Sequence, residues 1–371
     1  MIASQPTPLE PLHRELGARL TDFAGWSLPL SFAGTLAEHR QVREACGLFD
    51  VSHMAQFALR GPGAAAALGR LLPLRPAALK PGRGRYSVMC AADGGIIDDL
   101  IVSCDGASDY HVVSNASRAA AVASHAAAAI GPDCEWTRLE NRALLALQGP
   151  RAAAVCAGLF PAAAELGFMG SAWLEHAGKP VRVMRCGYTG EDGFEFSVAG
   201  AQAVPLARAL LAAEACAPAG LGARDVLRLE AGLCLYGQDL DERTSICAAG
   251  LQWLVPPALR AEPAFIGAER FAAENEHGCP ERLVGLVLEG RTPARAGAPV
   301  QLDGEEVGKV TSGCFSPNLG QPIALARLAS ERIDPAASYA AVVRGRELPC
   351  RLRELPFVPH RYFSQKSVSA K

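Results

Sequence analysis

Two adjacent carboxylates interrupt the apolar run Gly94-Gly95-Ile96-Ile97-Asp98-Asp99-Leu100-Ile101-Val102. The preceding pair Asp93-Gly94 is typical of a tight turn, because both residue types tolerate positive φ. On the other side of that turn, the run Arg85-Tyr86-Ser87-Val88-Met89-Cys90 alternates as a strand does. The whole segment therefore predicts a β-hairpin.

The alternation of a strand also predicts what surrounds each carboxylate, since successive side chains point to opposite faces. We expect Asp99 on one face with Ile97 and Ile101. Asp98 belongs to the other face, with Ile96, Leu100 and Val102. A carboxylate without a partner in apolar surroundings costs several kcal/mol or becomes neutral. Each aspartate is therefore expected to have a partner.

The position of the turn sets the register of this hairpin. A turn centred on Asp93-Gly94 pairs Asp99 with Val88, and Tyr86 with Ile101. Tyr86 and Asp99 then become diagonal neighbours on one face, within reach of one aromatic, nitrogen-bearing ligand. The alternative interpretation is structural: two aspartates that accept backbone N–H groups at a strand end.

The composition is that of a globular chain with a large core. Its 371 residues are enough for two or three domains, with 50% hydrophobic and 20% charged residues. The net charge is -2, from 36 basic and 38 acidic residues. This balance provides no electrostatic footprint for nucleic acid or for an anionic membrane.

Cysteine and histidine spacing argues against a metal centre. The 12 cysteines are scattered from Cys46 to Cys350 without a C-x-x-C pair, and the 8 histidines form no H-x-x-x-H group. We expect no metal and no disulfide framework, and mostly buried thiols.

No targeting or membrane segment is evident. Residues Met1–Glu10 have neither an apolar signal core nor an Arg-rich presequence. The longest apolar stretches, such as residues 119–130, are too short to span a bilayer. We expect a cytoplasmic protein without membrane association.

Short hairpins and single helices alternate along the first three-quarters of the chain, which predicts an α+β fold. A second hairpin is expected where residues 181–186 and 194–198 flank the glycine-rich run 187–193. In it, Glu195 faces away from Phe194 and Phe196. Helices are expected over residues 201–217 and from Gly220 through Leu235.

The last quarter differs from the rest. Residues 256–263 and 274–280 are the best boundary candidates, and residues 283–355 are short strands between Gly and Pro turns. This pattern predicts a small β-barrel or sandwich. The predicted division is 1–275 for two interleaved domains and 281–363 for the C-terminal barrel domain.

Several common catalytic motifs are missing: there is no Walker loop, no dinucleotide fingerprint and no G-x-S-x-G elbow. What remains are carboxylates, arginines and tyrosines at hairpin tips and helix starts. Such groups suit a flat, polar heterocycle with an acidic tail, because carboxylate and amide oxygens pair with ring N–H groups and Arg grips a carboxylate. The residues are Tyr86, Asp99, Asn115, Glu195, Arg224, Arg228 and Tyr236. Each of them alone has a structural explanation, and Arg224-Asp225 reads equally well as a local ion pair.

Six stretches of the sequence together resemble the aminomethyltransferase, or T-protein, of the glycine cleavage system. They occur in the family's order from about Thr7 to Tyr362, and any one alone would be weak. The stretches are residues 17–26, 49–54 (Phe-Asp-Val-Ser-His-Met), 86–87 with 94–100, 187–195 (Gly-Tyr-Thr-Gly-Glu-Asp-Gly-Phe-Glu), 220–237, and 311–313 with 316–320.

The resemblance implies a fold and a reaction. Three domains would surround a central folate pocket, the last being an all-β barrel or jelly-roll-like cap. Tetrahydrofolate would be the co-substrate, and the lipoyl arm of the H-protein would be the donor of an aminomethyl group. The products would be 5,10-methylenetetrahydrofolate, ammonia and the dihydrolipoyl H-protein.

The resemblance also implies roles for individual residues. Asp99 matches the family's catalytic carboxylate, and Met54 would lie near the arriving lipoyl sulfur. The pterin-side or pocket positions are Tyr86, Asn115, Glu195, Arg224 and Tyr236, with Tyr362 as a further folate contact. One departure is Ile246, where the family usually has proline, so the loop there is expected to be less rigid.

Two alternatives remain open. One is a related folate-dependent demethylase or one-carbon transferase that takes its carbon from another donor. The other is a non-enzymatic folate-binding assembly factor for iron-sulfur proteins. Those relatives carry a Lys-Gly-Cys type motif, whereas Cys234 here follows Gly232-Leu233.

Overall fold

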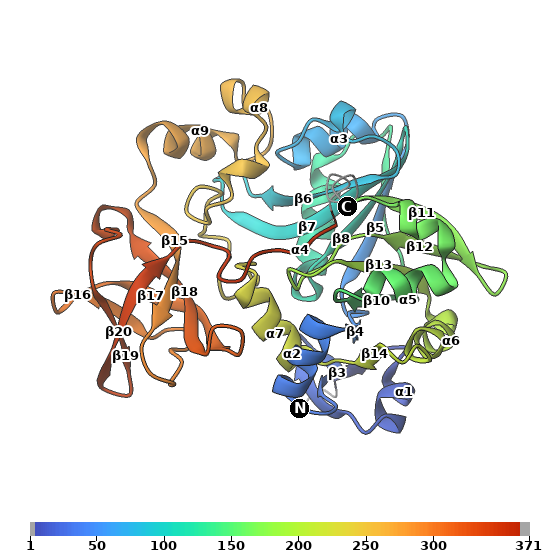
Figure 1. Cartoon of the computed structure of the whole chain (residues 1–371). Helices are drawn as coiled ribbons and strands as arrows, with labels where there is room; N and C mark the ends of the chain where they lie inside the picture. Colours follow the sequence, from blue (N-terminus) through green and yellow to red (C-terminus); the bar gives the residue numbers. More distant parts are fainter. Residues whose placement is uncertain (1–3, 364–371) are drawn as a thin grey trace, which may run out of the picture.

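The computed structural model describes residues 4–363. Three sheets, a closed barrel and the helices that cover them make up this part of the chain (Figure 1). The predicted α+β class is confirmed, because most neighbouring strands are antiparallel and the helices are inserted singly between hairpins.

The first large sheet carries the hairpin with the two aspartates. Its order is β6-β7-β8-β5-β9, with bounds β6 (Arg83–Cys90), β7 (Ile96–Gly106), β8 (Asp109–Ser114), β5 (Ala55–Arg60) and β9 (Glu135–Arg138). Helices α3 (Ala64–Leu71) and α4 (Ala119–Ala129) cover one face. Side chains such as Leu68 and Val122 pack there against Leu100 and Val102 in a fully buried cluster.

The second large sheet has the order β11-β12-β13-β10-β4-β14. Its strands are β11 (Ser171–His176), β12 (Lys179–Met184), β13 (Gly193–Ala199), β10 (Arg142–Gln148), β4 (Cys46–Asp50) and β14 (Cys216–Pro218). On one face, helices α5 (Ala152–Leu159) and α6 (Gly200–Leu211) cover Phe194 and Phe196. On the other, α2 (Thr35–Glu44) and α7 (Leu221–Glu230) pack over β4 and β10.

The C-terminal strands close into a barrel of order β15-β18-β17-β16-β19-β20, which confirms the barrel prediction. Its strands are β15 (Glu281–Leu288), β18 (Gln321–Ala329), β17 (Glu305–Ser316), β16 (Pro299–Leu302), β19 (Tyr339–Val343) and β20 (Arg346–Arg353). Helix α8 (Pro257–Ala261), inside the boundary candidate 256–263, and helix α9 (Ala268–His277), which ends inside the candidate 274–280, precede the barrel. After β20 the chain leaves the barrel and runs back across the body of the molecule (Figure 1).

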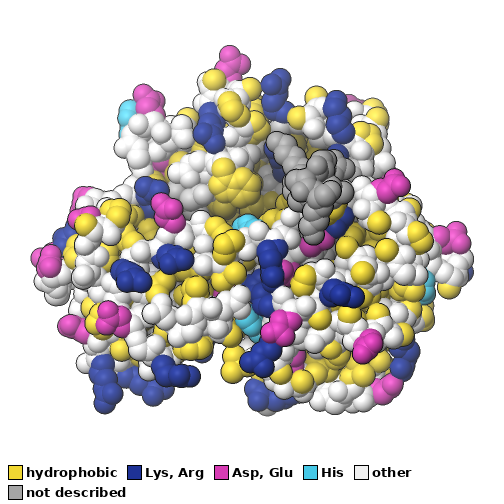
Figure 2. All heavy atoms as spheres, in the orientation of Figure 1, with side chains coloured by type: hydrophobic (Ala, Val, Ile, Leu, Met, Phe, Trp, Pro, Cys, Tyr) yellow, Lys and Arg dark blue, Asp and Glu magenta, His cyan; other side chains and the backbone are white. Residues whose placement is uncertain are grey.

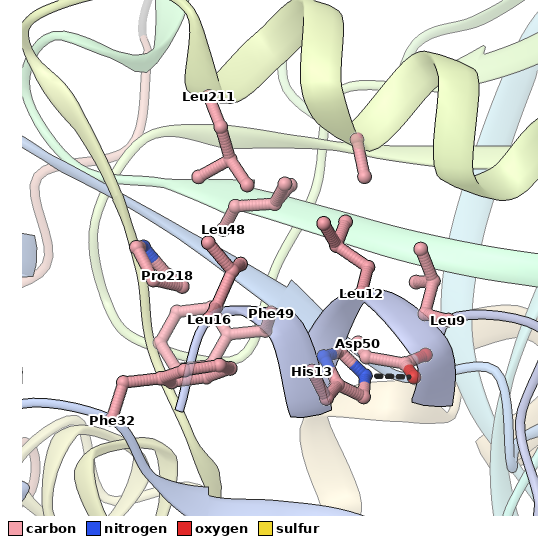
Figure 3. A pocket seen from close by; sticks show the side chains of 11 residues that line it. Leu9, Leu12, His13, Leu16, Phe32, Leu48, Phe49, Asp50, Leu211 and Pro218 are labelled. Atoms are coloured by element: carbon pink, nitrogen blue, oxygen red, sulfur yellow. Dashed lines mark hydrogen bonds and ion pairs between the residues drawn. The ribbon is translucent and has the colours of Figure 1, made fainter. Parts of the chain in front are cut away.

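The smallest sheet lies at the N-terminal end, beside helix α1 (Glu10–Glu15). It has the order β1-β3-β2, formed by β1 (Gln5–Pro6), β3 (Trp26–Ser31) and β2 (Arg19–Phe23). Figure 3 shows how α1 is held: Leu9 and Leu12 point into an apolar cavity of about 20 Å³, and His13 Nε2 bonds to Asp50 Oδ2 at 2.8 Å. The cavity is large enough for about one water molecule.

The register of the aspartate hairpin is as predicted: Val88 pairs with Asp99, and Tyr86 with Ile101. Gly94 adopts a φ of 80° in the turn, a conformation that glycine reaches without strain. The predicted faces were wrong at one point. A β-bulge between Met89 and Cys90 leaves Ile97 unpaired, because Cys90 pairs with Ile96 while Met89 pairs with Asp98.

The bulge exchanges the two isoleucines. Ile97 packs in the α3/α4 cluster with Leu100 and Val102, whereas Ile96 packs with Val88 on the face of Asp99. The apolar neighbours of Asp99 on β7 are therefore Ile96 and Ile101, not Ile97 and Ile101.

Two helices are shorter than predicted. Helix α7 ends at Glu230 instead of Leu235, because Gly232 takes a φ of 68° and the N–H groups of Gly232 and Leu233 bond to the carbonyls of Leu229 and Arg228. This is the Schellman pattern that terminates helices. Helix α6 ends at Leu211, and residues 216–218 form a short strand that pairs in parallel with β4.

All 12 cysteines lie within residues 4–363 and are free thiols. None of the helices in that range is long and apolar enough to cross a bilayer. Figure 2 shows basic and acidic side chains intermingled over the face in view, which agrees with the net charge of -2.

Candidate active site

Asp99 is the centre of a hydrogen-bonded cluster on the β6–β7–β8 sheet. The Tyr86 hydroxyl donates to Asp99 Oδ2 at 3.0 Å, and Asn115 Nδ2 donates to Asp99 Oδ1 at 2.8 Å. Tyr86 lies on β6, and Asn115 directly follows β8. The structure thus brings together three of the residues predicted for the site. The strands that carry or precede Tyr86 and Asn115 pair with the two edges of β7, which holds Asp99 between them.

Asp98 is the more deeply buried of the two aspartates, with 0% of its surface exposed. Its carboxylate accepts the backbone N–H of Asn115 at 3.0 Å and Asn115 Nδ2 at 2.8 Å. Asp98 therefore fits the structural interpretation, because its carboxylate ties the end of β8 to β7. The same interpretation does not describe Asp99, whose carboxylate partners are side chains.

Burial dominates the electrostatics of this pair. It raises the pKa of Asp99 to about 6, although the hydrogen bonds from Tyr86 and Asn115 pull that pKa down. Burial, with the neighbouring Asp99 charge, raises the pKa of Asp98 well above its ordinary value. The pKa of the Tyr86 hydroxyl is also raised, by burial and then by the Asp99 charge, so this phenol remains a hydrogen-bond donor.

A second group, Glu195 and Arg224, comes from different elements. Glu195 lies on β13, facing away from Phe194 and Phe196 as predicted, and Arg224 lies in α7. Burial raises the pKa of Glu195, and the Arg224 charge counters this in part. Within residues 4–363, Arg224 forms no ion pair, and its Nη1 is buried without a hydrogen-bond partner.

The local ion pair considered for Arg224 and Asp225 is wrong. Asp225 instead pairs with Arg228, one helical turn on, at 2.9 Å. Arg228 also pairs with Asp239 at 2.7 Å and donates to Ser312 of the barrel at 2.9 Å. Arg228, included among the candidate groups, thus joins α7 to the following loop and the barrel, while Arg224 keeps donors available.

Tyr188, which was not among the predicted site residues, links the two groups. Its hydroxyl donates to the Cys234 carbonyl, and the Arg224 guanidinium lies 4.7 Å from the centre of its ring. The Asp99 and Arg224 charges are both close enough to influence its raised pKa, which burial dominates. The signal was present in the sequence, because Tyr188 lies in the glycine-rich run 187–193.

Tyr236 lies beside Tyr86, whereas Met54 packs in a different cluster. Tyr236 donates to the Ile96 carbonyl at 2.9 Å and packs in the same cluster as Tyr86, with the Arg118 guanidinium 4.9 Å from its ring centre. Met54 is partly buried against the α2/α7 cluster, which includes Val113 of β8. Ile246 is 2% exposed and packs with Val88 and Ile96, apolar residues on the same face of the hairpin as Asp99.

Tyr362 lies on the segment that returns from the barrel. Its ring stacks on Phe168 with centroids 4.3 Å apart, and burial raises its pKa to about 12. Cys186 of the second hairpin is close enough to contribute to that shift, and the same Cys186 influences Glu195. The preceding residue, Arg361, forms a β-bridge with Glu191, so Tyr362 follows directly on a contact with the second hairpin, which also carries Glu195.

Trp253 is a further aromatic group that sequence reasoning missed. Its ring stacks on that of Tyr86, with centroids 6.1 Å apart, yet 64% of its surface is exposed. The small cavity under α1 is a separate feature. Over the range 4–363, no group of three or more His, Cys, Asp or Glu side chains is arranged to hold a metal ion.

Comparison with known families decides the family. Residues 9–258 match the GCVT N-terminal domain, and residues 281–359 match the glycine cleavage T-protein C-terminal barrel domain. The chain belongs to the glycine cleavage T-protein family.

Other members of the T-protein family are similar over nearly their whole length. The aminomethyltransferase of Rubrobacter xylanophilus is 45% identical over 356 residues, covering 95% of this chain and 93% of the relative. That of Thermus thermophilus is 44% identical over 368 residues, covering 95% and 99%. The crystal structure of the glycine cleavage system aminomethyltransferase T from Bartonella henselae matches with a TM-score of 0.93 at 39% identity, over 98% of this chain and 100% of that chain. The family and fold inferred from the six sequence stretches are thereby confirmed.

Proposed function

We propose that the chain transfers the methylene carbon of an aminomethyl group from the lipoyl arm of an H-protein to tetrahydrofolate. The products are 5,10-methylenetetrahydrofolate, ammonia and the dihydrolipoyl carrier. The observation that carries the proposal is the Asp99 cluster, because a carboxylate fixed by Tyr86 and Asn115 is positioned for acid–base work in a family of aminomethyltransferases.

The reaction explains why a held carboxylate is needed. The transferred carbon leaves sulfur, loses ammonia and bridges two folate nitrogens. Nitrogen 10 is a weakly basic aniline, so it needs help to close the ring. Asp99 orients this N–H, accepts its proton and stabilises the positive charge of the iminium carbon. Alignment of two large substrates supplies much of the remaining rate.

The second group of residues suits the rest of the folate. Glu195 provides carboxylate oxygens for pterin N–H groups, and Arg224 has buried guanidinium N–H groups without a partner in the described structure. Tyr86, Tyr236 and Tyr362 supply aromatic surface, and Asn115 orients Asp99. Met54 lies on the side where the lipoyl sulfur arrives.

The proposal includes a cytoplasmic location, the lipoylated H-protein as partner, and no requirement for a metal. It also includes the division into interleaved domains over 1–275 and a barrel domain over 281–363. The less rigid loop expected at Ile246 stays a prediction.

The decisive experiment incubates the protein with tetrahydrofolate and aminomethyl-loaded H-protein and measures released ammonia. Ammonia with formation of 5,10-methylenetetrahydrofolate supports the proposal. No ammonia, together with turnover of a methylated amine or sulfonium compound, favours the demethylase alternative instead. For the assembly-factor alternative, a reactive Cys234 would be expected, but burial raises the pKa of this thiol well above its ordinary value.

A further inference from the structure

The segment 357–363 crosses from the barrel to the second hairpin and is anchored at nearly every residue (Figure 1). The N–H of Val358 donates to the Glu230 carbonyl at 2.8 Å, and His360 Nε2 bonds to the Ala231 carbonyl at 2.8 Å. The next two residues are Arg361 and Tyr362. We name residues 357–363 the C-terminal strap.

Arg361 makes the contact between the strap and the glycine-rich tip of the second hairpin. Its backbone N–H donates to the Gly190 carbonyl at 2.7 Å. Its Nη2 donates to Glu191 Oε1 at 2.6 Å and to the Arg43 carbonyl at 2.8 Å. One residue therefore bridges the strap, the tip and the end of α2.

The carboxylate that Arg361 binds is buried and shared. Glu191 is 1% exposed, and its Oε1 also accepts a hydrogen bond from Arg43 Nη1 at 2.6 Å. The Arg361 side chain is 51% exposed. If Arg361 is lost, Glu191 still has Arg43 as a partner, so the core keeps its charge balance while the strap loses an anchor.

The strap and the tip each carry an aromatic residue of the proposed site. Tyr362 directly follows Arg361 and stacks on Phe168, and Phe363 lies against the Arg185 guanidinium at 3.7 Å. Tyr188 lies two residues before Gly190 in the tip, with Arg224 over its ring. A shift of the strap away from the tip would pull the Tyr362 ring off Phe168.

We propose that Arg361, by binding the hairpin tip, is a positioning residue that holds the Tyr362 ring on Phe168 and thereby assembles one wall of the folate pocket. It acts through Tyr362 and touches no substrate itself. The inference rests on the proposed function, because it assigns Arg361 a part in folate binding at that site.

The test measures tetrahydrofolate binding by calorimetry on the full-length protein without H-protein. The variants are Arg361→Met, Tyr362→Leu and the double variant, with Arg351→Met as a control in an exposed part of β20. We expect the Kd for tetrahydrofolate to rise about tenfold in each single variant. The Kd of the double variant should be no higher than that of the weaker-binding single variant, because the effects of coupled residues are not additive. The control should bind as the wild type does. In steady-state assays, Arg361→Met should raise the KM for folate more than it lowers kcat.

A Kd of Arg361→Met equal to that of the control would overturn the proposal. So would a double variant in which the two losses multiply, since Arg361 would then act independently of Tyr362. If Arg361→Met fails to fold, Arg361→Gln is measured in its place under the same criteria. Failure of the wild type to bind tetrahydrofolate would instead count against the proposed function, so the two failures are distinguishable.

Discussion

The Tyr86 hydroxyl donates a 3.0 Å hydrogen bond to Asp99 Oδ2, its diagonal neighbour across the β6–β7 pair, two residues from its direct partner Ile101. Asn115 binds the other oxygen from the far side of β7. Both oxygens of Asp99 are thus held by side-chain donors, and each keeps a lone pair for a further donor. The carboxylate is fixed in orientation while it remains able to accept a proton from a bound amine.

This geometry predicts that Asp99→Asn abolishes most turnover but leaves folate binding intact. The amide has nearly the same shape, yet it does not accept a proton, so kcat should fall roughly 10²–10⁴-fold. Ammonia release and calorimetric binding of tetrahydrofolate measure the two effects separately. Asp98→Asn is the matched control and should cost far less in rate, because Asp98 mainly ties β7 to Asn115. Near-normal turnover of Asp99→Asn would remove Asp99 from the mechanism.

The pH dependence should show an acidic limb set by the Asp99 carboxyl. Burial raises its pKa to about 6, so the charged form needed as a base is lost as the pH falls through that value. We expect kcat/KM for tetrahydrofolate to decline below about pH 6 in proportion to the ionised fraction. A rate profile from pH 5 to 8, with a separate check that the H-protein stays loaded, tests this. A flat profile across that range contradicts the assignment.

The same raised pKa predicts that Asp99 reduces stability at neutral pH. A carboxyl whose folded pKa lies above its unfolded value of 3.8 favours folding when protonated, and this contribution is lost as the pH rises through about 6. Asp99→Asn should therefore be more stable than the wild type at pH 7.5, by roughly 1–3 kcal/mol. The difference should shrink toward pH 4. Urea unfolding of both proteins at both pH values measures this difference. Equal stability of Asp99→Asn and the wild type at pH 7.5 would contradict the prediction, because the Asp99 charge would then cost nothing in the folded state.

The hairpin register could be predicted because Asp93-Gly94 locates the turn, and the alternation of side chains along the strands then sets which residues pair and share a face. The bulge that exchanges Ile96 and Ile97 could not be predicted, since both residues are equally apolar and local sequence does not choose between them. Tyr188 and Arg224 show the same limit at longer range. Their pairing depends on how α7 packs against the second hairpin, and no pattern in either segment specifies that contact.

Arg224 should contribute strongly to folate binding. Its guanidinium is largely buried, has no ion pair within the described residues, and has a pKa lowered by burial. An anionic or carbonyl oxygen of the ligand would satisfy these donors, because buried unpaired N–H groups are costly. Arg224→Met should raise the Kd for tetrahydrofolate about 10–100-fold, the effect of a charge-assisted hydrogen bond. Calorimetry checks this, with exposed Arg40→Met as the matched control; equal affinities would exclude Arg224 from the pocket.

Glu230 is a structural carboxylate whose removal should destabilise the protein strongly, because it joins α7 to α2 and to the barrel. Its Oε2 accepts from His39 and Arg43 at 2.8 and 2.7 Å, and its Oε1 accepts from Ser316 of the barrel at 2.6 Å. These partners lower its pKa despite burial, so its contribution to folding is present above pH 4.5 and lost as the pH falls further.

Glu230→Ala leaves the buried Arg43 with one carboxylate instead of two and removes a contact between α7 and the barrel. We expect a loss of about 3–5 kcal/mol, typical of breaking a buried charge network. Urea unfolding at pH 7.5 measures it, and Glu15→Ala, which removes a solvent-exposed pair with Arg208, serves as the control with little change. The destabilisation should fade at acidic pH, where Glu230 of the wild type is protonated as well. A Glu230→Ala midpoint close to that of the control would mean that the apolar contacts alone hold the barrel to α7.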